Sequence, residues 1–133
     1  DPEMSRGLGD VYKRQAMMTP TMKAFCRASG KKKFTPKDIE GMKATAKLRA
    51  GDRNPYSWNM DFFEYEDGSG YEARFTTCGI CTLMQVLGLY DLTSALCHLD
   101  YTMSDAGGAS DFVREYTLAS GGPYCDCGYH KKQ

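Results

Sequence analysis

Apolar side chains recur at helical spacing in two stretches of the N-terminal third of the chain. Over residues 16–28 the pattern predicts a helix, and a glycine followed by three lysines at 30–33 is expected to end it in a solvated connection. A second helix is predicted to begin at Thr35, because threonine caps helix N-termini and Pro36 suits the first helical position. We expect this helix to end near Gly51.

Alternating apolar and polar residues later in the chain predict two β-hairpins. Turn residues at 67–70 separate the first pair of strands, and a Ser-Gly-Gly-Pro turn at 120–123 separates the second pair. The predicted strands are residues 58–65, 71–75, 112–119 and 124–130.

Two helices are predicted between the hairpins. A short apolar run ends at Gly88, and a longer helix follows from Leu92 to about Met103, with Asp91 as its cap. Hairpins separated by helices do not give the alternating order of a doubly wound sheet. The pattern instead predicts one α+β domain, with an antiparallel sheet of two hairpins packed against three to four helices.

The first fifteen residues carry neither helical nor strand periodicity. Residues 10–15 resemble the translation of an adaptor used to prepare sequencing libraries, as occurs in open reading frames assembled from environmental DNA. We therefore interpret residues 1–15 as a non-native leader and residues 16–133 as the domain, and we expect the native N-terminus to be missing.

Charge and composition narrow the possible partners. Lysine and arginine together number 17, as do aspartate and glutamate, so no net positive charge favours nucleic acid or an anionic membrane. No apolar stretch approaches the roughly 18 residues of a membrane span. We expect a cytoplasmic protein that takes a small molecule; the composition leaves its oligomeric state open.

Six cysteines are the unusual feature of this composition. Without a recognisable secretory signal, we expect them to be reduced, and we assign Cys26 to the core. The others include two pairs that could supply four thiolates to zinc, with His98 or His130 as substitutes. The pairs lie farther apart than the about 15–20 residues of ribbon-like zinc sites. This alternative metal set is Cys78, Cys81, Cys125 and Cys127.

Two other interpretations of the thiols stay open on spacing alone. Cys78 and Cys81 precede a predicted helix, whose N-terminus could lower the pKa of a redox-active thiol. Cys97, Asp100 and Tyr101 can share one helical face and could form a nucleophilic site. Alternatively, Cys97 packs in the core while Asp100 faces solvent.

Three motifs in the C-terminal half favour the interpretation of Cys97 as part of a functional site. They are Cys97-His98-Leu99-Asp100-Tyr101, the segment from Arg114 to Gly122, and Cys125-Asp126-Cys127. In this order and at these separations they resemble the L-2-amino-thiazoline-4-carboxylic acid hydrolase family, over about residues 37–129. The resemblance implies an α+β hydrolase, without a cofactor, that opens 2-aminothiazoline-4-carboxylate towards N-carbamoyl-cysteine.

A hydrolase of this kind needs a nucleophile, a base and groups that bind the substrate. Our hypothesis makes Cys97 the nucleophile and Asp100 the base for water, with Asp126 bonded to the exocyclic amino group. The expected substrate-binding residues are Arg114, Arg74 and Cys125, with either arginine holding the carboxylate. The alternative function is a non-catalytic small-molecule or zinc-binding module that uses the cysteine clusters.

Overall fold

Two threonine-capped helices open the part of the chain that the structure, a computed structural model, describes, residues 19–133. The interpretation of residues 1–15 lies outside this range. Helix α2 (Pro20–Lys32) begins after Thr19, whose hydroxyl accepts a bond from the amide of Met22 at 3.3 Å. Helix α3 (Pro36–Arg49) begins as predicted after Thr35, whose hydroxyl accepts from the amide of Asp38 at 3.2 Å.

The sequence pattern predicts that the first helix stops before Gly30, and this prediction is wrong. It continues to Lys32, and Gly30 serves as a packing residue inside it: a Cβ at this position would lie 2.2 Å from the carbonyl oxygen of Gly107. The backbones of two helices therefore touch at this point, and only glycine allows that approach.

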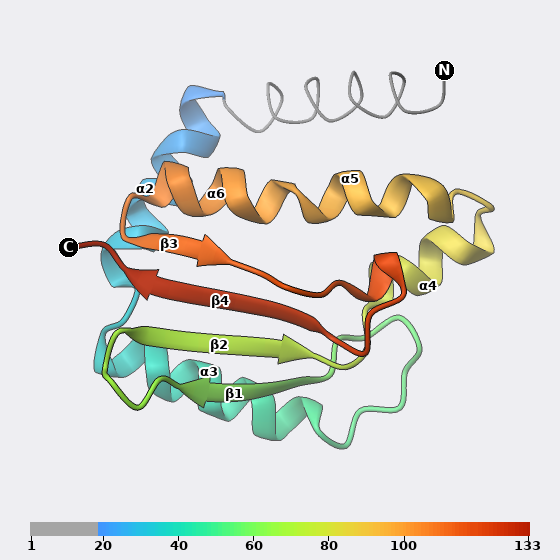
Figure 1. Ribbon diagram of the computed structural model, residues 1–133, viewed down its shortest axis with the longest axis horizontal. Coiled ribbons are helices and arrows are strands. Elements are labelled where there is room, and N and C mark those ends of the chain that lie inside the picture. Colours follow the sequence, from blue (N-terminus) through green and yellow to red (C-terminus); the bar gives the residue numbers. More distant parts are fainter. Residues whose placement is uncertain (1–18) are drawn as a thin grey trace.

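Four strands form one antiparallel sheet in the order β1-β2-β4-β3. Pairing of β2 with β4 joins the two hairpins edge to edge (Figure 1). The strands are β1 (Met60–Glu64), β2 (Gly70–Phe75), β3 (Ser110–Val113) and β4 (Cys125–Lys131). The prediction of a strand over 112–119 is wrong beyond Val113. There the chain leaves the sheet and forms a 3₁₀ turn, η2 (Leu118–Ser120), before it returns as β4.

The connection between the hairpins is helical, as predicted, but it is divided. Helix α4 (Gly79–Val86) and a 3₁₀ turn, η1 (Tyr90–Leu92), precede α5 (Thr93–Cys97) and α6 (Leu99–Gly107). The predicted helix over 92–103 is thus interrupted at His98, and Asp91 lies within η1 rather than capping it. Helix α6 ends at Gly107 and is capped by Gly108, which adopts the left-handed conformation.

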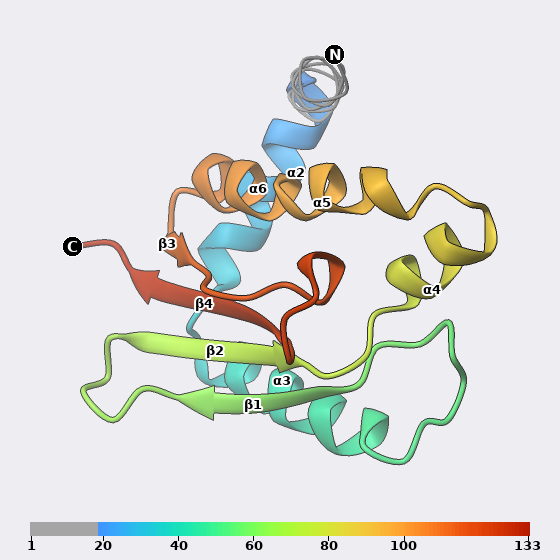
Figure 2. The same cartoon turned by 45° about the vertical axis from the view of Figure 1, so that its right-hand side comes forward.

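Helices cover one face of the sheet. Helix α3 lies along β1 and β2, while α6 runs beside β3 with α2 crossing it (Figures 1 and 2). The buried core of Met60, Ala73 and Cys127 is packed against Met42 and Ala46 of α3. The chain is a single α+β domain with an antiparallel sheet, which confirms the predicted fold class.

Candidate active site

Strand alternation on β4 decides which side chains reach the covered face of the sheet. Cys125 lies opposite Phe75 and Cys127 lies opposite Ala73 in the β2 register, and Cys127 belongs to the buried core. Successive side chains of a strand point to opposite faces, so Cys125 and Cys127 share the covered face, as the sequence predicts. Asp126, between them, is directed to the other face.

A cavity of about 240 Å³ lies between this part of the sheet and helices α4 and α5. Four thiols, one carboxylate and one guanidinium contribute to its wall, and we call it the thiol cavity. Its polar lining residues are Cys78, Cys97, Cys125, Cys127, Thr93, Asp100 and Arg114, and the rest of the wall is Trp58, Phe75, Ile80, Leu96 and Tyr129. Four cysteines from three separate places in the sequence therefore converge.

The buried guanidinium of Arg114 holds this wall together. It donates to Asp100 Oδ2 at 2.6 Å, to the carbonyl oxygens of Cys97 at 3.0 Å and Asp126 at 3.3 Å, and to Cys127 Sγ at 2.9 Å. Its side chain is only 5% exposed. Burial lowers the pKa of Arg114, but Cys127, Asp100 and Cys125 around it raise that pKa above its usual value overall. The cation is thus permanent and fully engaged.

The thiols of the cavity differ sharply in acidity. A hydrogen bond from the Cys127 thiol, assisted by the nearby charge of Arg114, outweighs burial and lowers the pKa of Cys125 to about 7. The same hydrogen bond, together with burial, raises the pKa of Cys127. Burial, with the neighbouring Cys125 next in importance, raises the pKa of Cys97 to about 11. Of Cys97, Cys125 and Cys127, it is therefore Cys125 that ionises near neutral pH, whereas Cys97 keeps its proton.

Alkylation should reveal this order directly. Because only the thiolate reacts, the rate at which iodoacetamide modifies Cys125 is expected to rise with pH and to reach half its plateau near pH 7. The substitution Cys127→Ala removes the largest cause of the low pKa, so the midpoint should move upward towards that of an ordinary thiol. Peptide mass spectrometry at a series of pH values measures both. A wild-type midpoint at or above that of an ordinary thiol would contradict the assignment.

The Cys78-x-x-Cys81 pair contributes one side chain to the cavity. Cys78 lines it, whereas Cys81 does not. Burial, followed by the adjacent Cys78, raises the pKa of Cys81 to about 12, which is unfavourable for a dithiol oxidoreductase. Within residues 19–133, no three histidine, cysteine or acidic side chains are placed to hold one metal ion. The arrangement therefore lends no support to the alternative zinc set that includes these two thiols with Cys125 and Cys127.

Two of the predicted site residues lie away from the cavity. The carboxylate of Asp126 accepts from the backbone amides of Glu115 at 2.8 Å and Tyr116 at 2.6 Å, which anchors the loop after β3. Arg74 pairs with Glu72 at 3.1 Å and stacks on the ring of Tyr124 at 4.3 Å. The structure thus brings together Cys97, Cys125, Asp100 and Arg114 from the predicted set, and it leaves out Asp126 and Arg74.

Thr93 is a site residue that the sequence pattern does not indicate. Its side chain is fully buried and lines the thiol cavity, and its Oγ1 has no hydrogen-bond partner among the described residues. Buried hydroxyls are almost always bonded, so an unpaired one beside a cavity marks a place where a ligand can bond. A threonine at the start of a helix usually indicates a cap. The sequence therefore does not indicate that Thr93 could bond to a ligand.

These features define a class of protein, an α+β domain with a cluster of thiols around a buried arginine. The sequence model of the L-2-amino-thiazoline-4-carboxylic acid hydrolase family matches residues 7–129, and the chain belongs to that family. The match begins within the segment interpreted as a leader. No curated protein and no solved structure matches the chain. None of the helices in residues 19–133 has the length and apolar character needed to span a membrane.

Proposed function

We propose that this protein hydrolyses 2-aminothiazoline-4-carboxylate, a small cyclic isothiourea, and releases N-carbamoyl-cysteine. The observation that carries the proposal is the ionisable thiol of Cys125 in a cavity of about 240 Å³. This volume is below the about 300–1,000 Å³ of drug-sized sites, which favours a ligand of the size of one small ring. Membership of the hydrolase family supports the reaction class.

The first chemical step exchanges one sulfur for another on the amidine carbon. The Cys125 thiolate attacks that carbon, a bond forms from Sγ to carbon, and the ring carbon–sulfur bond breaks with its electron pair passing to the ring sulfur. The thiol of Cys97, which burial keeps protonated, gives its proton to the departing sulfur. The product of this step is an isothiourea attached to Cys125. Cys125 therefore replaces Cys97 as the proposed nucleophile, and Cys97 becomes the proton donor.

The second step returns the enzyme to its starting state. Water attacks the same carbon, the bond to Sγ of Cys125 breaks, and the thiolate leaves with its electron pair. One proton of the water ends on the amidine nitrogen, and the other passes by way of Asp100 to Cys97. Asp100 lines the cavity and is held by Arg114 at 2.6 Å, which fixes the orientation of its carboxylate.

Recognition of the exocyclic amino group follows from the unpaired oxygen of Thr93. An amino N–H that donates to Thr93 Oγ1 would satisfy a buried acceptor that has no partner among residues 19–133. An analogue without this amino group would leave that oxygen unpaired, which normally costs about 1–3 kcal/mol. This contact favours an aminothiazoline over the same ring without the amino group.

The test is turnover of the compound itself. Purified protein is incubated with 2-aminothiazoline-4-carboxylate, and N-carbamoyl-cysteine is measured by mass spectrometry alongside a sample without protein. We expect product in excess of protein, and an intact-mass adduct on Cys125 within the first turnover. Saturable binding of the compound without any product would contradict the proposal and favour the non-catalytic small-molecule module instead.

A further inference from the structure

Two pairs of thiols are hydrogen-bonded to each other in this structure. The Cys127 thiol donates to the sulfur of Cys125 on strand β4, and the Cys81 thiol donates to the sulfur of Cys78 at the start of helix α4. All four are free cysteines. The second pair has no part in the proposed ring opening, so its own chemistry has to be explained separately.

The start of helix α4 brings Cys78 and Cys81 together. Cys78 is the N-cap residue, with an extended backbone (φ −135°, ψ 112°), and Cys81 is the third helical residue. The carbonyl oxygen of Cys78 accepts from the amide of Thr82 at 3.2 Å, which closes the first turn. An N-cap side chain reaches back over the second and third helical residues, as it does when it bonds to their amides. The sulfur of Cys78 is therefore directed towards that of Cys81.

Backbone spacing in this turn suits a disulfide. Two Cα atoms three residues apart in an α-helix are about 5 Å apart, given the rise per residue and the radius of the helix. Disulfides join Cα atoms that are about 4.4–6.8 Å apart. Residues two apart on a strand, such as Cys125 and Cys127, are spaced by about 6.4–6.8 Å. Their parallel Cβ bonds keep the Cβ atoms well beyond the about 3.8 Å of a disulfide. Of the two pairs, only Cys78 and Cys81 can be joined without a change in the backbone.

We propose that Cys78 and Cys81 form a site of reversible thiol–disulfide exchange, with low-molecular-weight disulfides as the oxidant. This inference goes beyond the proposed hydrolysis and does not depend on it. Both side chains are partly exposed, and Cys78 lines the thiol cavity whereas Cys81 does not. A small disulfide that enters the cavity therefore meets Cys78, and Cys81 supplies the second sulfur from outside the cavity wall.

The exchange takes two steps. The Cys78 thiolate attacks one sulfur of the small disulfide, whose S–S bond breaks, and the other half leaves with the electron pair. The Cys81 sulfur then attacks Sγ of Cys78, and the second small thiol leaves as the internal disulfide forms. Both thiol protons end on the two small thiols, so the protein loses two electrons and the small disulfide gains them. Burial raises the pKa of Cys81 to about 12, which makes the second step slow at neutral pH.

Equilibration with glutathione tests the assignment. The purified protein is kept in mixtures of reduced and oxidised glutathione until its thiol state is constant, and free thiols are then blocked with one alkylating reagent. Disulfides are reduced and labelled with a second reagent, and peptide mass spectrometry reads both labels. We expect Cys78 and Cys81 to be oxidised together, at a lower share of oxidised glutathione than any other thiols of the chain.

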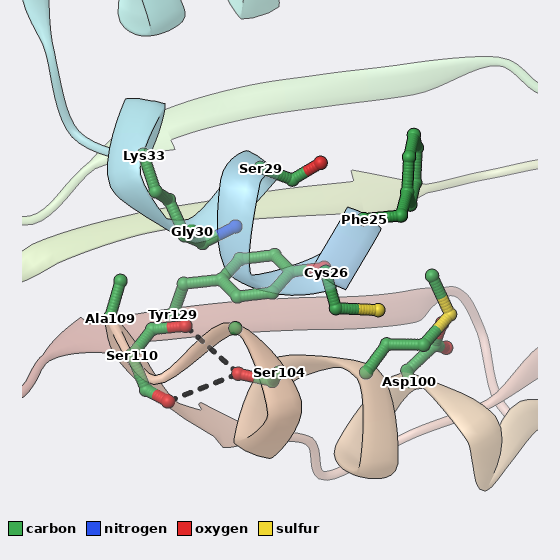
Figure 3. A pocket seen from close by; sticks show the side chains of 12 residues that line it. Phe25, Cys26, Ser29, Gly30, Lys33, Asp100, Ser104, Ala109, Ser110 and Tyr129 are labelled. Atoms are coloured by element: carbon green, nitrogen blue, oxygen red, sulfur yellow. Dashed lines mark hydrogen bonds between the residues drawn. The ribbon is translucent and has the colours of Figure 1, made fainter. Parts of the chain in front are cut away.

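Moving one thiol along the helix provides the matched control. The double variant Cys81→Ser, Leu83→Cys keeps six thiols but places the partner about 8–9 Å from Cys78 between Cα atoms, beyond the reach of a disulfide. Leu83 is exposed, so its replacement leaves the core unchanged. This variant should carry glutathione on Cys78 in place of an internal bond. Cys26→Ser should behave as wild type, because Cys26 lies in another cavity, of about 160 Å³, between α2, α6 and β4 (Figure 3).

Three outcomes would overturn the assignment. They are oxidation of Cys125 and Cys127 ahead of the helix pair, glutathione on Cys78 or Cys81 singly in wild type, and a helix pair that stays reduced at every ratio. An internal disulfide of equal stability in the displaced variant would also count against it. Because thiol state is the measured quantity, failure of the proposed hydrolysis leaves the result unaffected.

Discussion

The substitution Cys125→Ser is expected to lower kcat for ring opening by at least about a thousandfold, because it removes the nucleophile. A serine hydroxyl stays protonated at neutral pH, whereas the pKa of Cys125 is about 7. The covalent isothiourea on this residue should disappear from the intact-mass spectrum as well. Product formation at saturating substrate measures the first effect, and rapid quench followed by mass spectrometry measures the second.

Cys81→Ser is the matched control for this loss, because Cys81 is a half-buried thiol that does not line the thiol cavity. It should keep activity close to that of wild type. Cys97→Ser separates the two proposed roles: a lost proton donor costs about a hundredfold, less than a lost nucleophile. An active Cys125→Ser enzyme together with an inactive Cys97→Ser enzyme would restore the hypothesis that Cys97 attacks the substrate.

The substitution Arg114→Leu should lower the free energy of unfolding by about 3 kcal/mol. It leaves Asp100, the carbonyl oxygens of Cys97 and Asp126, and the thiol of Cys127 without their shared donor. Removing one partner of a buried ion pair typically costs about 3–5 kcal/mol, and the partial exposure of Asp100 places this case at the lower end. Urea denaturation followed by circular dichroism gives the difference directly.

Arg74→Leu provides the comparison, because it removes the same type of side chain from a more exposed position. Arg74 is 33% exposed, pairs with Glu72 and stacks on Tyr124, so we expect a loss of no more than about 1.5 kcal/mol. Losses of equal size in the two variants would contradict the claim that Arg114 organises the thiol cavity.

Local signals in the sequence were sufficient for most of the fold. The Thr-Pro start of α3 and the alternation in β1, β2 and β4 depend on near neighbours in the chain, and the structure contains all of them. The failures have a tertiary cause. Helix α2 passes through Gly30 because Gly107 packs there, and the chain leaves β3 after Val113 to form the loop that Asp126 anchors.

In the candidate site, too, local sequence patterns predict some features, and tertiary contacts decide the others. Alternation already places Cys125 and Cys127 on one face, and applied to Asp126 it would have removed that residue from the cavity. The lysine run at 31–33 was expected to be solvated, and Lys31 and Lys32 are exposed. Lys33 is the exception, since α2 brings it over Tyr129, nearly a hundred positions later in the chain, and no local pattern indicates such a contact.

Tyr129 gives the thiol cavity an aromatic wall of fixed orientation. Its ring lines the thiol cavity, and the Nζ of Lys33 lies 3.5 Å from the ring centroid. The ring also packs against the rings of Tyr71 and Phe112, with centroids 5.7 Å and 5.2 Å away. Contacts with three neighbours therefore fix the orientation of this ring, and a ligand in the thiol cavity meets an aromatic surface whose position is set before binding.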